Sequence, residues 1–127
     1  MQAKRIFEYA VIRVMPRVER GECLNVGVIL FCKQEGYLDM RYLLDAERLK
    51  ALYTDIDIED VRCHLASFEK ICRGDATGGA IAQLDRPSRF RWLSAKRSTI
   101  IQASEIHPGL TSDPAATLEK LFAEMVA

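Results

Sequence analysis

The chain has 127 residues and no net formal charge; 49% of its residues are hydrophobic and 28% are charged. This length and composition predict one globular domain over residues 1–127, able to build a core without metal ions or disulfides. Zero net charge argues against a strong whole-surface attraction to nucleic acid or to anionic lipid. The longest apolar run, residues 26–32, is too short to cross a bilayer, and the N-terminus lacks the apolar region of a signal peptide. We therefore expect a cytoplasmic protein with no membrane partner, and cysteines that remain thiols.

The first third of the chain predicts three consecutive strands. Residues 9–14 are β-branched and apolar, residues 24–32 are apolar at almost every position, and residues 37–44 follow a short turn at 33–36. A strand that is apolar on both faces is usually central and covered on both sides, so 24–32 is expected in the middle of the sheet. Gly27 within it indicates a bulge or a close approach of another backbone.

Three helices are expected after these strands. Asp45 can cap a helix over residues 46–53, and Asp57 can cap a longer one that ends at Gly74. The longer helix carries apolar residues at spacings of three and four, which places them on one face: Ile58, Val61, Leu65, Phe68 and Cys72. Asp113 and Pro114 open a final helix. Its inward residues are expected to be Leu118, Leu121, Phe122 and Met125.

The segments between these helices have weaker patterns. Residues 75–79 are expected to be a loop, 80–84 a helical turn, and 98–103 a fourth strand, whereas 90–93 fits a strand or a short helix equally well. His107-Pro108-Gly109 is typical of a turn. With strands early and helices mostly later, the sequence predicts an α+β fold: a small three- to four-stranded, mostly antiparallel sheet packed with about three helices.

The first candidate site is the loop between the first two strands. It places Arg17, Glu19, Arg20 and Glu22 within six positions, held between rigid elements. Arg13 lies at the end of the preceding strand. If its face of the sheet is covered, Arg13 needs a carboxylate such as Glu22 or an anionic ligand; alternatively, it simply reaches solvent.

Two further residue groups are candidates for chemistry. His107 sits before Pro-Gly, and if it lies against the loop, Glu22 and His107 are candidate catalytic acid–base groups; the alternative is a solvated turn residue. Residues 86–97 are rich in arginine and contain no acidic residue. Arg91, Trp92 and Arg97 there are candidates for binding a protein partner or a single-stranded nucleic acid, although a solvated basic face is the simpler interpretation.

Metal and cofactor sites are not indicated. The cysteines occur in pairs nine residues apart, which fits no zinc motif. Phosphate-binding loops, dinucleotide fingerprints and nucleophile elbows are absent from the sequence. Cys32 and Cys72 are expected in the core. Cys23 lies beside Arg20, which could lower its pKa, but neither histidine is near it in sequence.

Several segments together resemble one bacterial family, domain-of-unknown-function family 3037. They are residues 9–22, 24–31, 89–93, 97–99, 107–109 and 113–116. The resemblance carries no established activity or catalytic set. It implies a small standalone cytoplasmic protein whose gene neighbours often include one for a HipA-type kinase.

Our leading hypothesis is a non-enzymatic accessory protein, with a HipA-like kinase as its partner and with residues 17–22 and 86–97 as the binding surface. One alternative is a small phosphate-ester hydrolase or nuclease, in which Arg13, Arg17 and Arg20 hold the phosphate and His107 or Glu22 moves the proton. Another is a single-strand nucleic-acid binder centred on Phe90, Arg91 and Trp92. No residue indicates the oligomeric state, although an exposed edge strand could pair across a dimer.

Overall fold

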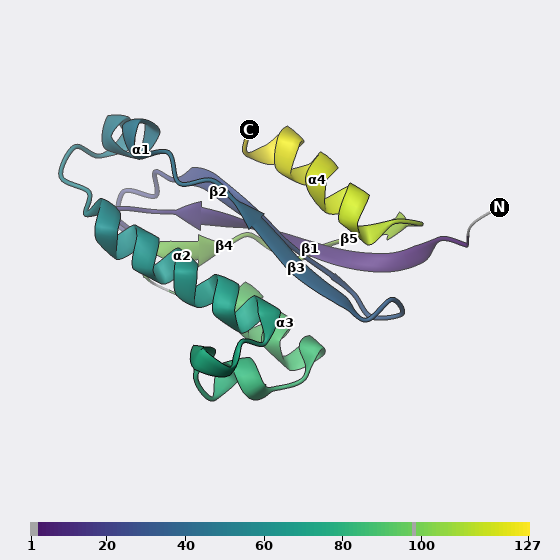
Figure 1. Ribbon diagram of the computed structural model, residues 1–127. Helices are drawn as coiled ribbons and strands as arrows, with labels where there is room; N and C mark the ends of the chain where they lie inside the picture. Colours follow the sequence, from purple (N-terminus) through teal and green to yellow (C-terminus); the bar gives the residue numbers. More distant parts are fainter. Residues whose placement is uncertain (1–2, 98) are drawn as a thin grey trace.

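The computed structural model of the protein describes residues 3–97 and 99–127. Its sheet is antiparallel and is built around a long central strand, β1 (Figure 1). The strands are β1 (Arg5–Val14), β2 (Leu24–Cys32), β3 (Tyr37–Tyr42), β4 (Ile101–Ala103) and β5 (His107–Thr111). The order is β3-β2-β1-β4, and β5 pairs with the other half of the same edge of β1. The fold is therefore α+β as expected, but the sheet has five strands rather than three or four.

Helices cover both faces of this sheet. They are α1 (Ala46–Leu52), α2 (Ile58–Arg73), α3 (Arg86–Ser94) and α4 (Pro114–Met125), with short 3₁₀ helices η1 (Ala76–Gly78) and η2 (Ile81–Gln83) before α3. In Figure 1, α2 and α3 lie on one side of the sheet and α4 lies on the other. The described residues thus form four α-helices, one more than the expected number of about three.

Each α-helix begins at an aspartate whose side chain accepts a hydrogen bond from a backbone N–H in the first turn. These residues are Asp45, Asp57, Asp85 and Asp113. Such a cap satisfies a donor that the helix itself leaves unpaired. Gly74 ends α2 in a left-handed conformation with a φ of 69°, which glycine adopts without steric cost.

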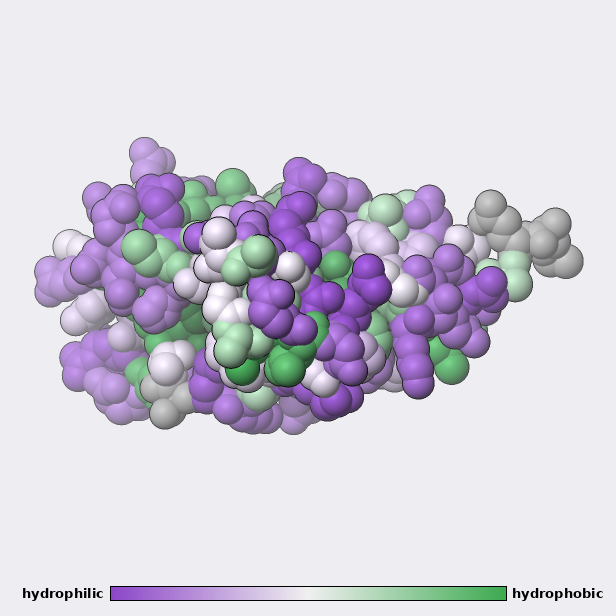
Figure 2. All heavy atoms as spheres, turned by 60° about the horizontal axis from the view of Figure 1, so that its bottom comes forward, coloured by the Kyte–Doolittle hydropathy of each residue, from purple (hydrophilic) through white to green (hydrophobic). Residues whose placement is uncertain are grey.

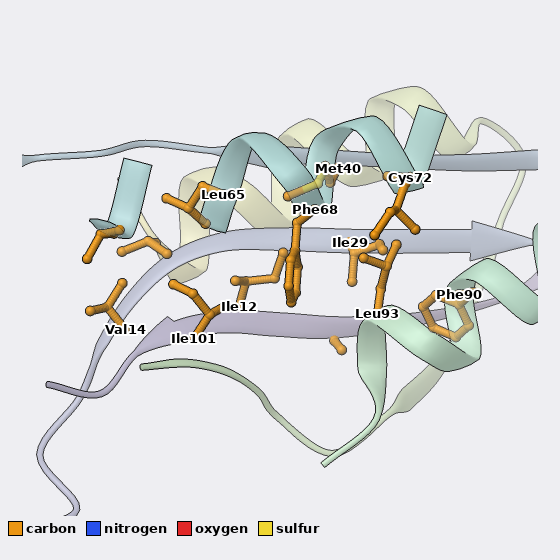
Figure 3. Close-up of a cluster of buried hydrophobic side chains, with 14 of the residues drawn as sticks. Ile12, Val14, Ile29, Met40, Leu65, Phe68, Cys72, Phe90, Leu93 and Ile101 are labelled. Atoms are coloured by element: carbon orange, nitrogen blue, oxygen red, sulfur yellow. The ribbon is translucent and has the colours of Figure 1, made fainter. Parts of the chain in front are cut away.

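Two hydrophobic clusters sandwich the sheet. The larger one lies between the sheet and helices α2 and α3, where Ile12, Ile29 and Leu65 are fully buried (Figure 3). The smaller one lies under α4 and includes Leu30 and Leu118. Neighbouring residues of β2 point into opposite clusters, so this strand is buried on both faces, as its apolar sequence predicts.

A bulge interrupts the pairing of β1 with β2. The register runs from Ile12 opposite Gly27 to Arg13 opposite Asn25, which leaves Val26 as the extra residue. A Cβ on Gly27 would lie 2.9 Å from the carbonyl oxygen of Arg41. The predicted close backbone approach at Gly27 is confirmed.

Several predicted boundaries were wrong. His107-Pro108-Gly109 is part of β5 rather than a turn, because it pairs with β1 from Phe7 to Tyr9. β1 begins at Arg5, earlier than the expected residue 9, and β3 ends at Tyr42. Residues 90–93, for which the sequence left a strand or a short helix open, are helical. The predicted loop 75–79 contains η1, and the fourth strand covers residues 101–103, while Ser98 lies outside the described residues.

Across residues 3–97 and 99–127, no helix is both long enough and apolar enough to cross a membrane.

Candidate functional site

The charged loop between β1 and β2 pairs its charges internally. Arg17 Nε lies 2.6 Å from Glu19 Oε1, and Arg20 Nη2 lies 2.6 Å from Glu22 Oε1. The bond to Glu19 raises the pKa of Arg17, while the backbone N–H of Glu19 and then Arg17 lower the pKa of the Glu19 carboxyl. The depression beside the loop has a volume of about 10 Å³, room for about one water molecule.

His107 does not meet this loop. It pairs with Tyr9 near the middle of β1, and the centroids of the two rings lie 5.3 Å apart. The loop begins beyond Val14, about 17 Å further along the strand. His107 instead lines a depression of about 350 Å³ together with Arg13, Lys96 and Glu105. The structure therefore brings Arg13 and His107 to one place and leaves Glu22 at another.

The hydrogen-bond partner of the Arg13 side chain is an amide and not a carboxylate. Its Nε donates to Asn25 Oδ1 at 3.1 Å, and Asn25 Nδ2 donates to the carbonyl oxygen of Met125 at 3.1 Å. No carboxylate oxygen of the described residues lies within 4.0 Å of the Arg13 guanidinium. The half-buried charge of Arg13 is thus left without an anionic partner beside the depression that it shares with His107.

Ser104 fixes the junction between β4 and β5. Its N–H donates to the carbonyl oxygen of Val11, and its Oγ accepts from Val11 N, both at 2.8 Å. The same hydroxyl donates to the carbonyl oxygen of Glu105. The buried Ser104 therefore continues the attachment to β1 where regular strand pairing stops. Its sequence context contains no motif that indicates this role.

A second depression, of about 440 Å³, lies on the α3 side of the junction. Its lining includes Arg91, Lys96, Ser104, Glu105 and Ile106. Lys96, Ser104 and Glu105 line both depressions, so the two adjoin at the β4–β5 junction. We call this region the junction surface; it comprises Arg13, Arg91, Lys96, Glu105, Ile106 and His107.

Charge on the junction surface is predominantly positive. Lys96 Nζ and Glu105 Oε1 lie 4.0 Å apart with both side chains largely exposed, which is a weak ion pair. Arg91 donates from Nη2 to Ser88 Oγ at 3.1 Å and remains exposed. Arg13, Arg91 and Lys96 thus outnumber the one carboxylate of this surface, Glu105, and an anionic ligand fits this charge distribution.

Trp92 and Arg97, the other binding candidates of the basic segment, contact Phe68 of α2. The Arg97 guanidinium lies 5.0 Å from the Phe68 ring centroid and 4.6 Å from that of Trp92, and it donates to the carbonyl oxygens of Trp92 and Leu93. Burial lowers the pKa of Arg97. Arg97 therefore caps the end of α3 by cation–π contacts and hydrogen bonds. Phe90 is 2% exposed, so its ring has no face free to stack on a base.

Hydrophilic side chains cover most of the face that Figure 2 presents, and its hydrophobic areas are small and separate. A large apolar docking patch is therefore not visible on that face.

The cysteines divide into exposed and buried thiols. Cys23 and Cys63 are exposed, whereas Cys32 and Cys72 are buried, as expected for the last two. Burial raises the pKa of Cys72 to about 12, so its thiol stays protonated at neutral pH and is not a nucleophile. Within the described part of the chain, no three His, Cys, Asp or Glu residues are placed to hold a metal ion.

The fold and this surface define an α+β protein with a helix-covered antiparallel sheet and a cationic recess beside an irregular edge. A family model described as "Protein of unknown function (DUF3037)" matches residues 9–126, nearly the whole chain. The chain belongs to this family, which confirms the resemblance found in the sequence. No curated protein and no solved structure matches it.

Proposed function

We propose that the protein is a non-enzymatic accessory protein that binds an acidic segment of a protein partner at the junction surface. The observation that supports this most is the open edge beside the two adjoining depressions. β4 and β5 pair only with β1 among the described strands, so their outer edges have no strand neighbour. An extended segment can add to such an edge through main-chain hydrogen bonds.

The side chains around this edge suit an acidic and partly apolar segment. Arg13, Arg91 and Lys96 supply positive charge, which steers an acidic partner and fixes its position. Ile106 is 41% exposed and Leu110 is 63% exposed, so both are accessible for apolar contacts along the same edge. Arg17, Arg20 and Arg97 are left out of this surface because each is already paired within its own segment.

A HipA-like kinase is the partner that the family resemblance implies, and we propose it as the first partner to test. Purified kinase is titrated with the wild-type protein and with the Arg91→Glu/Lys96→Glu double variant. We expect salt-sensitive binding that the charge reversal weakens at least about tenfold. Lys50→Glu on α1, which reverses an exposed charge away from the junction surface, should bind like the wild type.

Two outcomes contradict this proposal: no binding of the kinase at low salt, or equal binding of the kinase by the double variant and by Lys50→Glu. A pull-down from the native host with the same three proteins extends the test to other partners, because only a partner that the double variant fails to recover uses the junction surface.

Hydrolysis of a phosphate ester is a second candidate, favoured by the shared depression of Arg13 and His107. In this case Arg13 binds the phosphate and His107 transfers the proton. A screen with p-nitrophenyl phosphate compares His107→Gln with His64→Gln, whose histidine lies on α2. A catalytic His107 predicts a rate loss of about 10²–10⁴ for His107→Gln alone. Equal rates for the two variants contradict this function.

A further inference from the structure

A second cationic recess lies where α2 ends, α3 begins and the β2–β3 turn passes. It has a volume of about 270 Å³, and its lining includes Gly36, Asp39, Arg73, Arg86 and Arg89. It shares no lining residue with the junction surface. Three guanidinium groups and one carboxylate thus line a recess that the proposed function does not use.

Arg89 is the buried member of this group. It is 8% exposed, and its Nη1 donates to the carbonyl oxygens of Ile71 and Cys72 at 3.2 and 3.1 Å. Its Nε is buried and has no hydrogen-bond acceptor. No carboxylate oxygen of the described residues lies within 4.0 Å of this guanidinium. A buried charge with an unpaired donor is costly, and native proteins seldom leave one uncompensated.

The other two arginines are exposed and have weak or no ionic partners. Arg73 Nη2 lies 3.4 Å from Glu69 and 3.8 Å from Asp39, which are long contacts for an ion pair. Asp39 Oδ1 already accepts a hydrogen bond from Met40 N at 2.8 Å. Arg86 has no carboxylate within 4.0 Å in the described chain. Its Nη1 lies near Gly36, at 3.9 Å from the position that a Cβ on this glycine would take.

We infer that this recess binds a phosphate group, either free or carried on a small ester. Guanidinium groups bind phosphate oxygens with paired, charge-assisted hydrogen bonds, and clusters of arginine are the usual receptors for phosphorylated side chains. The recess is smaller than the range of about 300–1,000 Å³ typical of drug-sized ligands, so the ligand group is small. A bound dianion would supply the negative charge that Arg86 and Arg89 lack.

Calorimetric titration with inorganic phosphate and with O-phosphoserine tests this inference, using chloride at equal ionic strength as the control. Arg86→Gln should weaken binding at least about tenfold, since it removes hydrogen bonds to a charged group. Arg62→Gln is the matched variant: it removes the same charge from an exposed arginine of α2 that lines neither the recess nor the junction surface. It should bind phosphate like the wild type.

Arg89 provides an independent readout. Its Nε–H is buried, so its ¹H–¹⁵N signal should be observable and should move when phosphate is added. Arg89→Lys keeps the charge but loses the planar fork, and it should also bind more weakly. Binding of both probes points to an ester-borne group, and binding of inorganic phosphate alone points to the free ion.

The inference is overturned if neither probe binds more tightly than chloride, or if Arg86→Gln and Arg62→Gln lose affinity equally. Because the junction surface is elsewhere, loss of partner binding in its own variants has no bearing on this outcome.

Discussion

Gly109 of β5 lies directly opposite Phe7 of β1, and the aromatic ring occupies the place where a side chain on Gly109 would begin. A Cβ there would lie 2.6 Å from two ring atoms of Phe7. Phe7 is 6% exposed and belongs to the cluster under α4. Gly109 therefore serves packing rather than a turn, because the absence of a side chain lets the Phe7 ring approach the backbone of the edge strand.

Gly109→Ala should destabilise the protein by about 1–3 kcal/mol, because the added methyl group overpacks a buried ring. Urea denaturation measures the change in the free energy of unfolding. Leu110→Ala, at the exposed neighbouring position, should change it by less than about 0.5 kcal/mol. In the Phe7→Leu background the Gly109→Ala penalty should shrink; an unchanged penalty would show that the ring is not its cause.

Arg89→Met should lower the free energy of unfolding by about 1.5–3 kcal/mol, because it removes charge-assisted hydrogen bonds to the last carbonyls of α2. Arg91→Met on the same helix replaces an exposed arginine and should cost less than about 0.5 kcal/mol. Chemical denaturation of both variants measures the two changes in the free energy of unfolding. Equal losses would mean that the helix charge, and not the buried contacts of Arg89, stabilises the fold.

Asn25→Ala should loosen the end of α4, since Asn25 links Arg13 of β1 to the carbonyl oxygen of Met125. We expect a loss of about 1–3 kcal/mol for the two hydrogen bonds. Hydrogen exchange should show faster exchange of the Val126 amide, which bonds to Phe122 at the helix end, while Leu65 on α2 stays protected. Equal acceleration at both amides would indicate global destabilisation instead.

Stability should fall at alkaline pH because of Cys72 and Tyr37. Burial raises the pKa of Cys72 from 9.0 to about 12 and that of Tyr37 from 10.0 to about 12. Between these values the unfolded chain loses protons that the folded chain keeps, so the contribution of these two groups to the free energy of unfolding is constant below pH 9 and decreases from pH 9 toward 12. Cys72→Ala should flatten this decline in urea titrations, and a slope equal to that of the wild type would contradict the assignment.

Elements with strong local signals were predictable from the sequence. The apolar spacing of α2, its cap at Asp57 and its end at Gly74 are all local, and the structure confirms them. β2 was expected at the centre from its continuous apolar run, and it is buried on both faces. Asp85 and Pro87 also carry the signal of a helix start, which resolves the ambiguity of residues 90–93 in favour of α3.

Elements that depend on distant pairing were not predictable. His107-Pro108-Gly109 has turn-forming residues, but Pro108 is tolerated in β5 because that strand pairs on one side only. The separate locations of Glu22 and His107 follow from the same pairing. Likewise, no local pattern distinguishes the buried Arg89 and the capping Arg97 from the exposed Arg91, since the difference arises from contacts with α2.

The position of β1 at the centre of the sheet has a consequence for how the chain folds. The Val11–Ser104 hydrogen bonds join residues 93 positions apart, so one edge of β1 stays open until nearly the whole chain is present. Closing such long loops slows folding, and an open strand edge is an aggregation risk in the meantime. A nascent or truncated chain that ends before Ile101 would expose this edge and depend on chaperones or rapid completion to avoid aggregation.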